Sequence, residues 1–251
     1  PTSSVSGDSS NSDPRWKRSS AKAAKETPAP HYLGHRERLR ERLLAGGTAA
    51  LADYELLEVL LFAAQPRGDL KPLAKSLISR FGSFAGVLAA DRDALRAMPG
   101  MGDVSAATLL AVHEAGVRLL RAEVHARPVI SSWQQLIDYC NAAAGFAETE
   151  EFRLLFLDRK NALIADERQQ RGTIDHVPVY PREVVKRALD LGASALIMVH
   201  NHPSGDTTPS KGDIEMTRAV AKATAAVGIT VHDHLVIGRG RHTSFKSLGL
   251  L

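Results

Sequence analysis

The chain has 251 residues, 44% of them hydrophobic, which is enough for one large domain or two ordinary ones. Its single cysteine, Cys140, excludes an internal disulfide and a zinc site made of thiolates, and its apolar neighbours favour a buried structural thiol. The net charge of +4 is compatible with nucleic acid but does not require it. Without a long apolar run or an export signal, we expect a cytoplasmic protein that does not associate with membranes.

Residues 1–30 are rich in Ser, Ala, Lys and Pro, and we expect a disordered tail because they cannot bury enough apolar surface. Apolar periodicity then predicts a helical domain over residues 31–120. Asp53 is expected to cap the second helix of this domain. The predicted helices span His35–Leu44, Tyr54–Ala64, Pro72–Arg80, Asp91–Ala97 and Val104–Leu120.

The turn before the last of these helices contains Gly100 and Gly102, within the sequence Met-Pro-Gly-Met-Gly. A glycine turn that enters a helix exposes backbone N–H groups at a positive dipole end, which suits a phosphate. The turn resembles the helix-hairpin-helix element, so we consider both glycines candidate nucleic-acid-binding residues. Equally, the turn could simply close a helical bundle, because it holds no basic residue. The nearby cations that could compensate are Lys71, Lys75, Arg92 and Arg96.

Residues 121–132 form the expected linker, and 133–251 the second domain. Its mixture of strands and helices predicts an α+β fold with a mixed sheet. The predicted helices are Trp133–Ala143, Pro181–Leu191 and one that begins near Gly212. The predicted strands are Glu151–Asp158, Ala162–Glu167, Thr173–Tyr180, Ala195–Val199 and Ile229–Ile237.

Two histidines follow the apolar strand at Ala195–Val199. Because side chains alternate along a strand, His200 and His202 should point the same way. Ser210 is placed to cap the next helix, and Asp213 then falls in its first turn. A loop returning to that helix can bring the carboxylate over both imidazoles. Three such ligands would leave an open position for water on a catalytic zinc.

The pattern of His200, His202, Ser210 and Asp213 resembles the JAMM signature of the MPN/JAB metalloproteases. The surrounding HNHPSGD, TPS, DHLVIG and VYPREVVKRAL segments resemble the bacterial RadC family in particular, from about Gly34 to Leu251. This resemblance implies a zinc hydrolase with an MPN fold that acts on a protein or peptide. Asn201 departs from the pattern, since many JAMM proteases carry a serine there.

The JAMM resemblance also implies a glutamate that acts as general base. Glu167, at the end of a predicted strand, is our first candidate, and Glu183, near a helix start, is the second. Acidic residues at a helix N-terminus are also expected for dipole reasons alone. In the same family, the serine that matches Ser210 helps to hold the oxyanion.

A second histidine pair, His232 and His234, flanks Asp233 at strand spacing, and Asp233 could orient a metal-bound histidine. Weaker candidates for that role are Asp175 and His176. Nitrogen and oxygen ligands favour zinc first and manganese second.

Two functions remain open at this point. One is a zinc-dependent peptide or isopeptide hydrolase behind a helical domain. The other is a DNA-associated repair or recombination protein whose metal site is structural or cleaves phosphodiesters.

Overall fold

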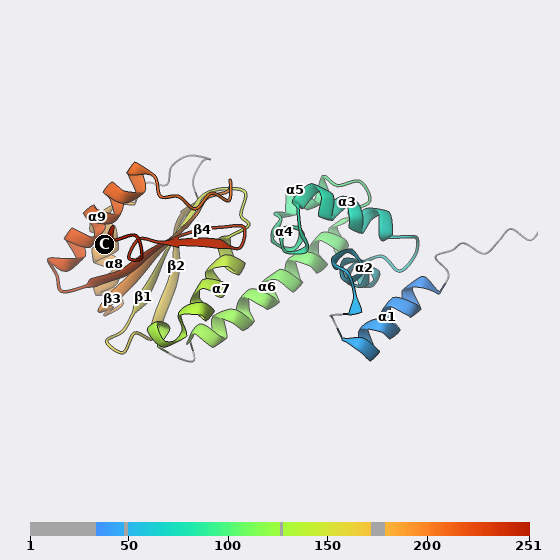
Figure 1. Cartoon of the computed structure of the whole chain (residues 1–251), viewed down its shortest axis with the longest axis horizontal. Coiled ribbons are helices and arrows are strands. Elements are labelled where there is room, and N and C mark those ends of the chain that lie inside the picture. Colours follow the sequence, from blue (N-terminus) through green and yellow to red (C-terminus); the bar gives the residue numbers. More distant parts are fainter. Residues whose placement is uncertain (1–33, 48–49, 126–127, 172–178) are drawn as a thin grey trace, which may run out of the picture.

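A computed structural model describes residues 34–47, 50–125, 128–171 and 179–251. The predicted tail at 1–30 and most of the predicted strand at 173–180 lie outside these residues. The described chain has an N-terminal helical region followed by a five-stranded mixed sheet with helices on it (Figure 1). The α+β prediction is therefore confirmed. Among the described helices, none has the length and apolar character needed to cross a membrane.

The helical region begins with five helices: α1 (His35–Gly46), α2 (Asp53–Ala64), α3 (Lys71–Phe81), α4 (Phe84–Ala89) and α5 (Arg92–Arg96). All except α4 match predictions closely. The short α4 was not predicted, although Ser83 caps it by accepting a hydrogen bond from the Gly86 N–H. The predicted cap at Asp53 is wrong by one residue, because Ala52 occupies the cap position and Glu55 accepts its N–H.

The helix α6 (Asp103–His125) runs five residues beyond its predicted end at Leu120. Its first half contributes Ala106 and Leu109 to the core of the helical region. Its last turn places Val124 in the core beneath the sheet. At about 1.5 Å per residue, this helix is roughly 35 Å long. The helix α6 therefore contributes to both cores, and Figure 1 shows it running from the helical region to the sheet.

The sheet contains strands in the order β2-β1-β3-β4-β5. Only β3 and β4 are parallel, and the other neighbours pair antiparallel. β5 was not predicted, although positive φ angles at Arg239 and Gly240 form the tight turn that returns the chain into it. The strands are β1 (Glu151–Leu157), β2 (Leu163–Arg171), β3 (Ala195–Asn201), β4 (Thr230–Gly238) and β5 (Arg241–Ser244).

Helices cover both faces of the sheet because alternate strand residues bury apolar side chains on opposite faces. One face packs against the end of α6 and against α7 (Trp133–Ala144), which follows the short 3-10 helix η2 (Val129–Ser132). The other packs against α8 (Pro181–Asp190) and α9 (Lys211–Ala225). The candidate metal site lies on this second face, where β3 ends and α9 begins.

A buried network of charged and polar side chains connects β1 and β2 to α7. Two guanidinium nitrogens of Arg153 donate to the Asp166 carboxylate at 3.1 and 2.8 Å, and the Tyr139 hydroxyl donates to the same carboxylate. The Asp166 side chain is fully buried and that of Arg153 is 17% exposed. Each charge is therefore compensated within the core, as buried charges require.

Candidate metal centre

The two histidines predicted to share a face do so at the end of β3. His200 is 5% exposed, and the N–H of His202 donates to the Ile237 carbonyl, so the extended conformation continues past the strand end. The two Nε2 atoms lie 2.9 Å apart. Strand alternation thus places two imidazole nitrogens at one point, as the sequence predicted.

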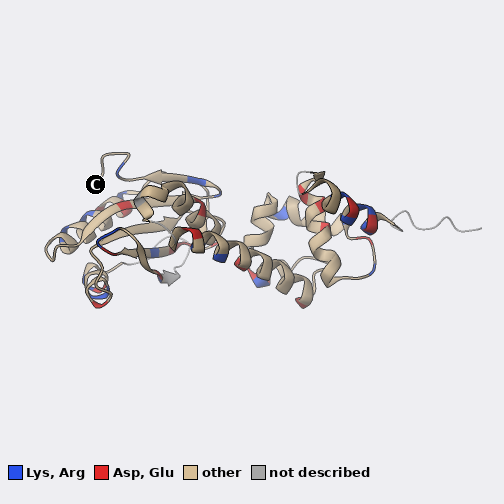
Figure 2. Cartoon of the chain, turned by 90° about the horizontal axis from the view of Figure 1, so that it is seen from below, with Lys and Arg blue, Asp and Glu red and all other residues tan. Residues whose placement is uncertain are grey.

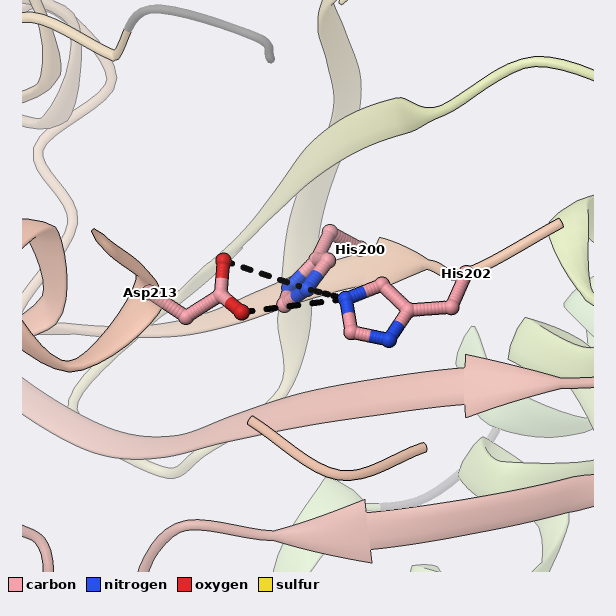
Figure 3. A group of neighbouring side chains, drawn as sticks. All are labelled: His200, His202 and Asp213. Carbon is pink, nitrogen blue, oxygen red and sulfur yellow. Dashed lines mark hydrogen bonds and ion pairs between the residues drawn. The ribbon is translucent and has the colours of Figure 1, made fainter. Parts of the chain in front are cut away.

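The helix start at α9 brings a carboxylate to the same point. Ser210 is the N-cap predicted from the sequence: its Oγ accepts from the Asp213 N–H at 3.1 Å, and Asp213 Oδ2 accepts from the Ser210 N–H at 2.7 Å. Asp213 Oδ1 lies 3.4 Å from His200 Nε2, and Oδ2 lies 3.7 Å from His202 Nε2. Figure 3 shows the three side chains pointing at one another.

These three residues form a group whose potential ligand atoms all lie within 4.8 Å of one another. Zinc–nitrogen bonds of 2.0–2.1 Å on a tetrahedral ion would separate two nitrogens by roughly 3.3 Å. The observed separations of 2.9, 3.4 and 3.7 Å are close to that value. Two imidazoles and one carboxylate are also a donor set that catalytic zinc uses. The residues present therefore fit a zinc ion.

The charges at the site are strongly coupled. Burial opposes a charge on Asp213, but its close contacts with the His200 and His202 imidazoles outweigh it and hold the pKa of its carboxyl far below the usual range. The same contact with Asp213 raises the pKa of His202. His202 Nδ1 also lies 2.6 Å from the Asp206 carbonyl, which only accepts, so Nδ1 carries a proton and Nε2 faces the site.

A third histidine lies behind His200. His234 is fully buried, and its Nε2 lies 2.8 Å from His200 Nδ1, while its own Nδ1 lies 2.6 Å from Thr217 Oγ1. Burial lowers the pKa of His234 well below its usual value. The prediction that Asp233 contacts the histidine ligand is wrong, because Asp233 accepts from Ser244 and from the Lys246 N–H instead. The weaker candidates Asp175 and His176 lie outside the described residues.

Glu167 was predicted to lie at the end of its strand, but β2 continues to Arg171. The Glu167 carboxylate accepts three hydrogen bonds from Arg187 of α8, at 2.5 to 3.0 Å. In addition, β1 lies between β2 and the histidine strand. Glu183 is exposed on α8 and pairs with Arg182. Among the described residues, no hydrogen bond or ion pair joins either glutamate to the three candidate ligands.

Glu150, immediately before β1, is a better-placed carboxylate that the sequence did not indicate. Phe152 of β1 lies opposite His200 in antiparallel register, so continuing that register places Glu150 beside His202. Phe152 also stacks on the His200 ring, so alternation directs Glu150 to the same face. Consistent with this position, the negative charge of Glu150 contributes to raising the pKa of His202.

Asn201, the residue between the two histidines, holds the segment that carries Glu150. Its side chain points to the opposite face and is fully buried. Its Oδ1 accepts from the Glu151 N–H at 2.7 Å, and its Nδ2 donates to the carbonyls of Thr149 at 3.1 Å and Ala147 at 3.4 Å. An asparagine can make all three contacts, whereas the shorter serine of many JAMM proteases has one hydroxyl to offer.

The glycine turn with Gly100 and Gly102 lies between α5 and α6, at the end of α6 that belongs to the helical region (Figure 1). Gly100 has a φ of 88°, which explains the glycine there, and Gly102 is open to its surroundings. Asp103, the first residue of α6, pairs with Arg96 at 2.7 Å and puts a negative charge at the turn. Basic and acidic side chains also alternate along α1, beside the grey trace in Figure 2.

Comparison with known proteins agrees with this architecture. Residues 130–250 match the family described as RadC-like JAB domain, and residues 31–107 match the family described as UPF0758 N-terminal. A UPF0758 protein of Rhodobacter capsulatus is 60% identical over 213 residues, or 85% of this chain and 100% of the relative. Another, of Ruegeria pomeroyi, is 55% identical over 223 residues, or 88% of this chain and 100% of the relative. The chain therefore belongs to the UPF0758 family and carries a RadC-like JAB domain.

Proposed function

We propose that the protein is a zinc-dependent hydrolase that cleaves a peptide or isopeptide bond in a protein or peptide substrate. The observation that carries this proposal is the convergence of His200, His202 and Asp213 at one point, with Glu150 alongside them. Zinc held by these three side chains would supply Lewis acidity and a water whose pKa falls to near neutrality. Membership of a JAB-domain family supports the same reaction class.

Each remaining step uses side chains of this chain. Glu150 would accept a proton from the attacking water and deliver it to the leaving amine as the carbon–nitrogen bond breaks. Ser210 still has its hydroxyl proton, because its Oγ accepts from the Asp213 N–H. That proton can be donated to the oxygen of the substrate carbonyl, where negative charge develops. The two roles need two separate groups, and the capping contact of Ser210 with Asp213 and the effect of Glu150 on His202 support this assignment.

The first test is the metal content of the purified protein, measured by elemental mass spectrometry beside the His200→Ala/His202→Ala double variant. About one zinc per chain is expected in the wild type, and the double variant should lose it. Hydrolysis is then measured with quenched peptides and with branched peptides that contain a lysine ε-amide bond. A wild-type protein that cannot be loaded with zinc, or a zinc-loaded one that cleaves neither type of peptide, would contradict the proposal.

Three matched variants identify the general base. Glu150→Gln should keep its zinc and lose about 10²- to 10⁴-fold in rate, the usual contribution of general acid–base catalysis. Glu167→Gln should lose mainly its surface pairing with Arg187, and Glu183→Gln only an exposed contact with Arg182. Full activity in Glu150→Gln together with loss in either of the other two would reassign the base.

Nucleic-acid binding by the helical region stays a separate prediction. Gly100→Ala should weaken any DNA binding, because a φ of 88° disfavours residues with a side chain. Filter binding at low salt measures this effect, since phosphate contacts are strongest there. Equal retention of DNA by the wild type and this variant would remove the glycine turn as a contact.

A further inference from the structure

A chain of hydrogen bonds runs behind His200 and returns to the helix that bears Asp213. It passes from His200 Nδ1 to His234 Nε2 at 2.8 Å, then from His234 Nδ1 to Thr217 Oγ1 at 2.6 Å. Thr217 Oγ1 in turn donates to the backbone carbonyl of Asp213 at 2.5 Å. His234 and Thr217 are both fully buried, so water does not compete for these contacts.

The position of every proton in this series of hydrogen bonds follows from its last acceptor, the Asp213 carbonyl. The Asp213 carbonyl can only accept, so the Thr217 hydroxyl donates its one proton there. The Thr217 oxygen must then accept from His234, which places a proton on His234 Nδ1. A second proton would put a charge on this fully buried ring, so His234 Nε2 keeps a lone pair and accepts from His200 Nδ1–H. The lone pair of His200 is therefore on Nε2, the atom that faces His202 and Asp213.

Ring packing holds the same arrangement. Phe152 stacks on His200 at 6.2 Å between ring centroids with planes 13° apart, and Phe245 stacks on His234 at 4.5 Å and 28°. Both imidazoles are thus held in the planes that their hydrogen bonds need. Partners that orient a histidine ligand in this way commonly change metal affinity by about 10- to 100-fold when removed.

We propose that Thr217 and His234 are positioning residues that hold His200 in the tautomer able to bind a metal through Nε2. The inference rests on the proposed zinc site and assigns it a hydroxyl and an imidazole that touch neither metal nor substrate. Without the Thr217 hydroxyl, His234 has no acceptor for a proton on Nδ1. Its proton can then move to Nε2, which makes His234 a donor and forces the His200 proton onto Nε2, the ligand atom.

The test compares three threonine variants on one helix. Thr217→Val removes the hydroxyl with little change in shape, and Thr217→Ser restores it. Thr224→Val is the matched control, because Thr224 is also fully buried on α9 but donates only to backbone carbonyls of that helix. Zinc affinity is measured by competition with a chromophoric chelator. We expect about 10- to 100-fold weaker binding in Thr217→Val and near wild-type binding in the other two.

A second measurement does not depend on zinc. Nitrogen-15 NMR of the imidazoles in the metal-free protein should show His200 protonated on Nδ1 in the wild type and in Thr217→Ser. A proton on Nε2 of His200 in the wild type would overturn the inference, as would wild-type zinc affinity in Thr217→Val. Failure of every protein to bind zinc would refute the proposed function instead, and the NMR result would still decide the tautomer.

Discussion

Replacement of Asn201 by alanine should both destabilise the protein and release the segment that carries Glu150. The change removes three hydrogen bonds, to Glu151, Thr149 and Ala147, at 2.7, 3.1 and 3.4 Å. A buried N–H left unpaired costs about 1–3 kcal/mol, and the two carbonyls lose weaker partners. We expect a total of about 3 kcal/mol, which lowers the melting temperature by roughly 6–12 °C for a chain of this size.

Scanning calorimetry measures that loss, and hydrogen exchange locates it. The Glu151 amide should exchange on the order of 100-fold faster in Asn201→Ala, because its acceptor is gone. Asn201→Asp is the comparison, since it keeps an acceptor for that amide but loses both donors. Under the proposed function, Asn201→Ala should still bind zinc but lose hydrolysis, because the candidate ligands are untouched and Glu150 is displaced. An unchanged melting temperature with a still-protected Glu151 amide would refute this reasoning.

Asp166→Ala should cost about 3 kcal/mol in thermal melts, because it leaves the largely buried charge of Arg153 with only its longer contact to Glu151, at 3.9 Å; an unchanged melting temperature would contradict that. Burial raises the pKa of the Cys140 thiol, so intact-mass measurement should show alkylation by iodoacetamide only after denaturation, and rapid alkylation of the native protein would exclude a buried thiol. Asp213 raises the pKa of His202, so their pairing in the metal-free protein stabilises fully below about pH 6.5 and is lost as pH rises through the higher folded value. Melting temperatures in chelator should therefore fall as pH rises above about 6.5, and Asp213→Asn should reduce that fall.

Local patterns predicted that the three candidate ligands lie together, because their geometry is local. Alternation along a strand is enough to pair His200 with His202, and the spacing from Ser210 to Asp213 is that of a capping box. The family resemblance added the reaction class. The same kind of local signal predicted most helices, since their apolar periodicity and their caps lie within a few residues.

The residues that support the ligands could not be predicted in this way. Glu150 reaches the site only because β1 pairs with β3, and strand order is not visible in a local pattern. The sequence pointed to Asp233 rather than His234 as the neighbour of His200, because alternation does not say which side chains of β4 share a sheet face with His200. Thr217 depends on both the pairing of β4 and the packing of α9. Contacts between elements distant in sequence decide all three positions.

The helix α6 has a practical consequence for dividing this protein. The first family match ends at residue 107 and the second begins at residue 130, so most of α6 lies between them. A fragment beginning at residue 130 would lose Val124 from beneath the sheet, along with Val117 and Leu120 that pack around it. The apolar face of the sheet that α6 normally covers would then be exposed, which would favour aggregation. Fragments meant to isolate the sheet domain should therefore keep the whole of α6. Their solubility should be tested, because the first half of α6 would lose its packing against the helical region.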